Sequence, residues 1–133
     1  MDIDDGAMLA DILDKNPGTS INGRDSNGRT PLEIAVMMND ARIFEMLLTD
    51  PRTKLGAQTP CGESVLHQAC FVKFLECVKL FTSDRRCTPD VLNMKTLEGN
   101  TGLMVAVYFG SLECVRYLVE LPGIDLGPKD MGQ

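Results

Sequence analysis

Apolar residues recur at helical spacing in this chain, in pairs of short segments rather than in one long run. In the first such pair, Leu32 and Ala35 stand three apart, so both fall on one face of a helix. Ile43, Met46 and Leu47 then follow at helical spacing on a second face. Two polar residues, an asparagine and an aspartate, separate the segments. The pattern therefore predicts two short helices joined by a tight turn.

This pattern repeats along the chain with a period close to 34 residues. Three columns keep successive intervals of 34 and 37: Gly28, Gly62 and Gly99; Thr30, Ser64 and Thr101; and Ala35, Ala69 and Ala106. A second apolar block begins at Ile43, Cys77 and Cys114 with the same spacing. One pair of short helices is too thin to hide its own apolar face. The repetition therefore predicts a stack of such pairs.

Local signals at the start of each unit support a helix there. Thr30, Ser64 and Thr101 carry hydroxyl oxygens that can accept hydrogen bonds from the free amides of a first helical turn. Pro31 follows at the first helical position, where its missing N–H costs nothing. The small alanine of each unit lets two antiparallel helices approach closely. We therefore expect each unit to begin with a capped helix.

Residues 28–35 read Gly-Arg-Thr-Pro-Leu-Glu-Ile-Ala and resemble the ankyrin repeat signature, Gly-x-Thr-Pro-Leu-His-x-Ala. The likeness extends over roughly residues 8–133. It implies an all-α fold, an ankyrin-repeat solenoid of stacked helix–turn–helix units with short β-hairpin-like loops. The implied single domain, 1–133, divides into a partial repeat at 7–24, repeats at 25–58, 59–95 and 96–128, and the start of a further repeat at 129–133. Because the ends match only parts of a repeat, we expect a piece of a longer array, and the alternative is that the acidic N-terminal helix caps the stack.

The chain departs from the family signature in several columns. The signature histidine is present only as His67, with Glu33 and Met104 in its place elsewhere. In the family this histidine forms hydrogen bonds at the helix start, so the resemblance implies a structural rather than a catalytic role for His67. The glycine of the turn between helices remains only as Gly110. The middle unit also carries three extra residues near 82–92, where we expect the loosest loop.

Composition narrows the functions that fit. The formal net charge of −6 disfavours general binding to phosphate backbones. No tryptophan and only 5% aromatic residues leave the core to aliphatic side chains, which favours helices. No apolar stretch is long enough to span a bilayer, and the chain start lacks the pattern of a secretory signal. Five cysteines, an odd number, indicate free thiols in a reducing compartment. We therefore expect a cytoplasmic protein, with the nucleus as the alternative.

No constellation of residues suggests catalysis, so we expect neither enzyme activity nor a cofactor. One histidine leaves little room for a serine–histidine–acid triad, and no glycine-rich phosphate loop with a following lysine occurs. Cys61, His67 and Cys70 come nearest to a metal cluster, but structural zinc needs four well-placed ligands. Cys77 and Cys114 share one column of neighbouring repeats, where packed helices stand about 8–10 Å apart. That separation exceeds disulfide reach, so the pattern predicts two free, largely buried thiols.

The resemblance implies a module that binds another protein, a scaffold or adaptor that acts through its hairpin tips and the exposed end of each first helix. Carried onto this chain, the expected partner-binding residues are Arg24, Asn27, Arg29, Met37, Met38, Glu63, Phe71, Val72, Leu97, Asn100, Tyr108 and Phe109. The three helix-end pairs among them are apolar. They form either an exposed interface patch or ordinary packing between repeats, and we expect one residue of each pair in each role.

Two other function classes fit a repeat array. One is a regulatory or spacer array within a larger enzyme or membrane channel. The other is a nucleic-acid or nucleotide-sensing module, which would need more basic tips than Arg24, Arg29 and Lys95 provide. We expect a protein partner, no nucleic acid, no direct membrane contact and a monomeric chain in isolation.

Overall fold

The computed structural model describes residues 21–26 and 28–126. In that part of the chain seven α-helices follow one another and no strand occurs. They are α2 (Pro31–Met37), α3 (Ala41–Thr49), α4 (Val65–Phe71), α5 (Leu75–Ser83), α6 (Pro89–Leu92), α7 (Gly102–Tyr108) and α8 (Leu112–Leu118). The expected all-α fold is therefore confirmed. Most of the expected partial repeat at 7–24 and all of 129–133 lie outside the described residues.

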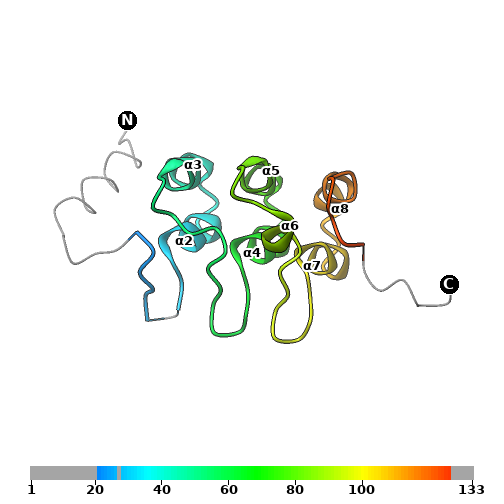
Figure 1. Ribbon diagram of the computed structural model, residues 1–133, viewed down its shortest axis with the longest axis horizontal. Helices are drawn as coiled ribbons and strands as arrows, with labels where there is room; N and C mark the ends of the chain where they lie inside the picture. Colours follow the sequence, from blue (N-terminus) through cyan, green and yellow to red (C-terminus); the bar gives the residue numbers. More distant parts are fainter. Residues whose placement is uncertain (1–20, 27, 127–133) are drawn as a thin grey trace.

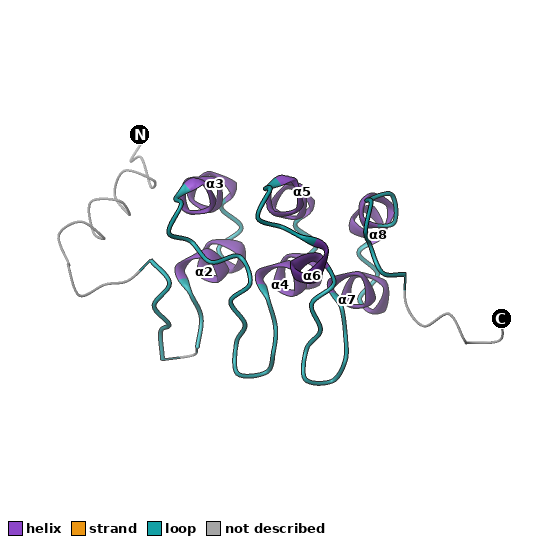
Figure 2. Cartoon of the chain, viewed as in Figure 1, coloured by secondary structure: helices purple, strands orange, loops and turns teal. Residues whose placement is uncertain are grey.

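The helices stack in two layers (Figure 1). The first helices of the units, α2, α4 and α7, lie side by side in one layer, and α3, α5 and α8 form the other. Within each unit the first helix also packs against the second. Three hairpin loops project from the layer of first helices, on the side away from the second helices (Figure 2). The expected stack of helix–turn–helix units is thus confirmed.

Helix starts follow the local signals in the sequence. The Thr30 side chain accepts a hydrogen bond from the backbone N–H of Glu33, and Pro31 occupies the first turn of α2. The Thr101 hydroxyl accepts from the backbone N–H of Met104 in the same way at α7. Each of these bonds satisfies an amide that the helix itself leaves unpaired. The hydroxyl residues therefore cap α2 and α7, but the expected cap at α4 is not made, because the Ser64 hydroxyl lies 2.9 Å from Nδ1 of His67 instead.

A residue with left-handed backbone conformation turns the chain between the two helices of each unit. The φ angles are 59° at Asn39, 63° at Lys73 and 73° at Gly110. A side chain costs about 1–2 kcal/mol in this conformation, whereas glycine adopts it freely. Asn39 and Lys73 therefore hold the same turn as Gly110 at some cost in stability.

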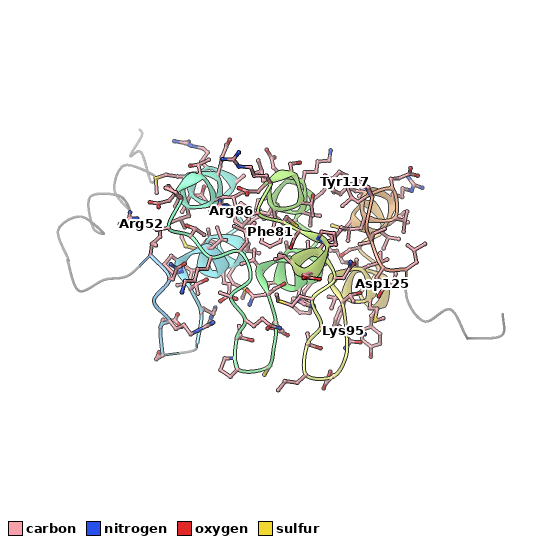
Figure 3. The ribbon with its side chains drawn as sticks, viewed as in Figure 1. Arg52, Phe81, Arg86, Lys95, Tyr117 and Asp125 are labelled. Atoms are coloured by element: carbon pink, nitrogen blue, oxygen red, sulfur yellow. The ribbon has the colours of Figure 1, made fainter. Side chains whose placement is uncertain are left out.

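The core lies between the two layers and continues from unit to unit. Phe44, Phe81 and Leu118 from the second helices are fully buried there, and Figure 3 labels Phe81 at the boundary of the layers. The alanine column is buried as well, which lets the first helices pack closely. Because each unit buries its apolar face on its neighbour, the array presents a stable frame for its loops.

The hairpin loops are built alike and bond to one another. In the second loop the Thr59 N–H donates to the Glu63 carbonyl at 2.8 Å, and in the third the Thr96 N–H donates to the Asn100 carbonyl at 2.9 Å. The Leu97 N–H then donates to the Cys61 carbonyl at 3.1 Å, which joins the two tips. The loops are therefore β-hairpin-like, as expected, although no strand occurs between residues 28 and 126.

The insertion near residues 82–92 is not the loose loop that its extra length predicts. It contains α6 and is tied to the first unit by Arg86, which lies between α3 and α5 in Figure 3. The Arg86 guanidinium donates to the carbonyls of Leu48, Asp50 and Thr53, just beyond the end of α3 or within its last turn. The expectation was wrong because the extra residues supply a cation that satisfies carbonyls another unit leaves unpaired.

A glycine is required where α7 approaches α4. Gly102 occupies the column of Pro31 and Val65, and a Cβ atom built on it would stand 2.9 Å from Cγ of Leu66. That atom is a branch point in the core, and Leu66 is itself fully buried, so it has little room to move. Gly102 therefore sets the close packing of the second and third units.

Replacing Gly102 with alanine is expected to lower the free energy of unfolding by roughly 1–3 kcal/mol, because the added methyl overpacks the contact with Leu66. Urea denaturation would measure the change. The matched control is Gly56→Ala, where the new Cβ meets only ordinary contacts, the nearest being Met94 at 3.5 Å. Equal stability for the two variants would mean that Leu66 gives way easily and that the close approach is unimportant.

The expected free thiols are confirmed. Cys77 and Cys114 are both buried and unbridged. Burial also raises the pKa of Cys77 to about 12, so this thiol stays protonated at neutral pH.

None of the helices in residues 21–26 and 28–126 is long and apolar enough to cross a membrane.

Candidate partner-binding groove

A groove of about 1420 Å³ runs along the first helices on the side of the hairpin loops. Its floor comes from α4 and α7, and the tips of the second and third loops, seen below these helices in Figure 2, form its rim. Met37 of α2 and Leu126 lie at its two ends. The groove therefore spans three units of the stack and is open to solvent along its length.

Three aromatic rings form the centre of the groove. Phe109 meets Phe71 edge-to-face, with ring centroids 4.7 Å apart, and meets Tyr108 in the same way at 4.9 Å. The three residues remain 52% (Phe71), 82% (Tyr108) and 43% (Phe109) exposed. Edge-to-face packing is a preferred arrangement of aromatic rings. The three rings therefore contact one another and yet remain largely uncovered.

The structure brings together eight of the twelve residues that the sequence analysis selected. The eight that line the groove are Arg29, Met37, Glu63, Phe71, Leu97, Asn100, Tyr108 and Phe109. Arg24, Met38 and Val72 are exposed but lie outside the lining, and Asn27 lies outside the described residues. Repeat position thus placed most of the selected residues, though not most of the lining, in the groove without any contact information.

The expected division of roles, one residue of each apolar pair exposed and one packed on the next unit, is met only in part, where Phe71 contacts Phe109 of the next unit. Both members of all three pairs are exposed, down to Val72 at 36% and up to Tyr108 at 82%. Packing between first helices is supplied instead by residues nearer the helix starts, such as Leu66 and Gly102. The helix ends are consequently left to solvent, except where Phe109 rests on Phe71.

Some groove residues escaped the sequence analysis. Val107 lines the groove and is 61% exposed, although its counterparts Val36 and Cys70 are buried. Leu126 is exposed at the end of the groove, and Gln68 is a buried polar residue in its wall. The repeat columns could not have found Val107, because its column is buried in the first two units and exposed in the third.

His67 links the second unit to the third. Its Nδ1 accepts from the Ser64 backbone N–H at 2.9 Å, and Nε2 lies 2.7 Å from the Asn100 carbonyl oxygen. Because an amide can only donate, Nε2 must carry the proton and donate to Asn100. Burial lowers the pKa of His67, which keeps the ring neutral. Both ring nitrogens are engaged, so the structural role implied by the resemblance fits this geometry.

Glu33 occupies the same column in the first unit, but only one of its two carboxylate oxygens has a hydrogen-bond partner. Its Oε1 accepts from the Thr30 backbone N–H at 2.9 Å, while its buried Oε2 has no hydrogen-bond partner. Burial raises the pKa of Glu33, opposed by the bonds to Thr30 and by the charge of Arg24. The carboxyl group stands where His67 has a donor, and only its protonated form could donate there.

The geometry of Cys61, His67 and Cys70 does not support a metal site. Cys61 is exposed at a loop tip, whereas Cys70 is buried at the end of α4. Both nitrogens of His67 are already hydrogen-bonded. Within residues 21–26 and 28–126, no group of three or more histidine, cysteine, aspartate or glutamate side chains is placed to hold a metal ion.

Comparison with known proteins agrees with this architecture. A family model described as ankyrin repeats (three copies) matches residues 41–130, more than half of the chain. The chain is also similar to the tyrosine-protein kinase HTK16 of Hydra vulgaris, with 26% identity over 119 residues. That alignment covers 89% of this chain but 15% of the kinase. The chain therefore spans a small part of the length of this curated relative.

Proposed function

Because the chain belongs to the ankyrin repeat family, whose members generally bind proteins, we propose that it is an interaction module that holds a segment of a partner protein in its groove. The observation that carries this proposal is the exposed ring cluster of Phe71, Tyr108 and Phe109. The edge-to-face contacts orient the rings relative to one another, and a surface that is already arranged lowers the cost of binding.

The groove has the composition of an interface core. Aromatic residues and methionine are enriched at the centres of protein interfaces, and both types lie in the lining. Contiguous apolar surface is costly to leave in water and usually marks a binding site. The rim is polar, with arginine, glutamate and asparagine side chains at the loop tips. An apolar centre with a polar rim is the arrangement that excludes water around binding hot spots.

Binding without catalysis is part of the proposal. What supports it is that His67, the one histidine of the sequence, has both ring nitrogens committed to the contact between units. A general base needs a free nitrogen within reach of a substrate proton. The free state of all five cysteines supports a reducing compartment, the cytoplasm or the nucleus.

A second candidate function is a regulatory or spacer array within a larger protein. The similarity to a tyrosine-protein kinase, of which the alignment covers 15%, favours it. In such a protein the groove would hold a segment of the same polypeptide. A nucleic-acid-sensing role gains no support, because the groove lining carries more carboxylates than cations.

A random peptide library displayed on phage tests the proposal. The wild-type chain is expected to enrich peptides, and the double variant Phe71→Ser/Tyr108→Ser is expected to bind them at least about tenfold more weakly. Leu112→Ser is the control, because Leu112 is 60% exposed but lies outside the groove. Circular dichroism would confirm that all variants fold. Failure to enrich peptides, or equal binding by the double variant, would contradict the proposed function.

A further inference from the structure

We infer that the segment held in the groove is cationic, with an arginine beside apolar residues, its guanidinium placed between the Tyr108 ring and the carboxylates of Glu63 and Glu98. This inference rests on the proposed function and adds the chemistry of the partner. The charge of the rim, the exposed face of Tyr108 and an unsatisfied amide in the wall each support it.

The charge of the groove is negative. Among the described residues, its lining carries the carboxylates of Glu63, Glu98 and Asp125 against one guanidinium, that of Arg29. His67 also lines the groove but is neutral, because burial lowers its pKa. The chain as a whole has a net charge of −6, so its long-range field attracts cations too. A cationic segment is therefore steered to this surface and complements it.

Two of these carboxylates are uncommitted. Glu63 and Glu98 form no side-chain hydrogen bond or ion pair with the described residues, and the two salt bridges described there, Arg52–Asp50 and Arg86–Asp84, lie away from the groove. The bond between Leu97 and Cys61 holds the loop tips of both glutamates side by side. A single fork-shaped guanidinium suits a pair of carboxylates on neighbouring tips.

Tyr108 provides a platform for the same cation. Its ring is 82% exposed, and one edge-to-face contact joins it to Phe109. A cation over an aromatic face gains about 0.5–2 kcal/mol, the larger value when water is excluded. Arginine stacks on such rings more readily than lysine because its guanidinium is planar and weakly hydrated. Tyr108 therefore favours arginine among the basic residues.

Gln68 places an acceptor that lacks a hydrogen bond in an otherwise apolar wall. Its side chain lies in the groove wall, the residue is 8% exposed, and its Oε1 is buried without a hydrogen-bond partner. An unsatisfied buried acceptor costs about 1–3 kcal/mol, and a donor on a bound segment recovers it once the Gln68 amide rotates toward the groove. The rest of the wall, with Phe71, Leu97 and Val107, is apolar, so we expect apolar residues beside the donor in the bound segment. An acidic segment offers neither the positive charge nor the additional donors.

The test uses peptides enriched on the wild-type chain from a random twelve-residue library. We expect them to share arginine next to apolar residues. In a synthetic copy of one such peptide, replacing arginine by its neutral analogue citrulline is expected to weaken binding about tenfold, as is the protein variant Glu63→Gln/Glu98→Gln. The control Glu45→Gln/Glu120→Gln makes the same charge change at exposed positions outside the groove and is expected to bind normally.

The outcomes distinguish the cationic partner segment from the peptide-binding function on which it rests. Enriched peptides that are neutral or acidic, or equal affinity for Glu63→Gln/Glu98→Gln and its control, would overturn the cationic partner and leave a peptide-binding groove standing. If no peptide is enriched at all, the proposed function fails and this inference fails with it. Anisotropy at two salt concentrations gives a further readout, because an arginine–carboxylate contact at the rim weakens as salt rises.

Discussion

Replacing Arg86 with methionine is expected to lower the free energy of unfolding by about 2–4 kcal/mol. The guanidinium donates to the carbonyl of Thr53 at 2.9 Å, to that of Asp50 at 3.2 Å and to that of Leu48. It also forms two bonds with the Asp84 carboxylate, at 2.9 and 2.8 Å. Methionine keeps the aliphatic stem but donates to none of these groups. Each partly buried acceptor left without a partner costs about 1–3 kcal/mol before relaxation and water reduce the sum.

Urea denaturation of Arg86→Met beside Arg85→Met measures this effect with a control one residue away. Arg85 is exposed, and its replacement is expected to change stability by less than about 0.5 kcal/mol. Arg86→Lys is expected to lose most of the stability as well, because one ammonium group cannot reach three carbonyls and a carboxylate at once. If Arg86→Met unfolds like Arg85→Met, the insertion does not join the first two units.

Changing Glu33 to histidine is expected to raise the free energy of unfolding by about 1–3 kcal/mol at pH 8. The new ring can accept from Thr30 and offer a donor on its far side, as His67 does between Ser64 and Asn100. In the wild-type chain the Oε2 atom at this position is buried without a partner. The substitution therefore removes an unsatisfied buried group and supplies a bond between units.

The pH dependence of this variant gives the sharper test. Burial raises the pKa of Glu33 above 4.5, so the folded chain holds its proton more tightly than the unfolded chain does. The stability from Glu33 is complete below about pH 4.5 and is lost as the pH rises through the raised pKa. A buried histidine has a lowered pKa, as His67 has, so its contribution is complete above about pH 6.5 and declines as the pH falls.

The advantage of Glu33→His should therefore be largest at pH 8 and should shrink or reverse near pH 4.5. Denaturation at both pH values measures it. Glu33→Gln is the matched control: its amide donates without titrating, so it should gain stability at pH 8 without a histidine's loss in acid. A constant difference between wild type and Glu33→His across this range would show that Glu33 is already satisfied, by solvent or by another group.

The repeat architecture could be predicted from the sequence because it depends on local, periodic rules. Thr30 and Thr101 of the hydroxyl column cap α2 and α7, and the alanine column is buried where the first helices pack. The position of Tyr108 at the end of a first helix placed it in the candidate site before any contact was known. Such features recur at the same place in every unit, so one unit predicts the next.

Features that belong to a single unit could not be predicted in this way. Arg86 lies in the insertion, where the period breaks, and the carbonyls that it binds are more than 30 residues earlier in the chain. The exposure of both residues of each helix-end pair depends on how far the neighbouring helices reach, which no column reveals. The unsatisfied oxygens of Glu33 and Gln68 depend on three-dimensional contacts in the same sense.

Methyl NMR of the chain with a peptide enriched on it tests the groove most directly. The described apolar residues in the groove include Met37, Leu97 and Val107, whereas Met46 and Leu80 lie on the second helices, outside it. A groove that holds a partner segment predicts that the methyl signals of the first three shift on titration while those of Met46 and Leu80 stay in place. The largest shifts at Met46 and Leu80, with an unchanged signal at Met37, Leu97 and Val107, would contradict it.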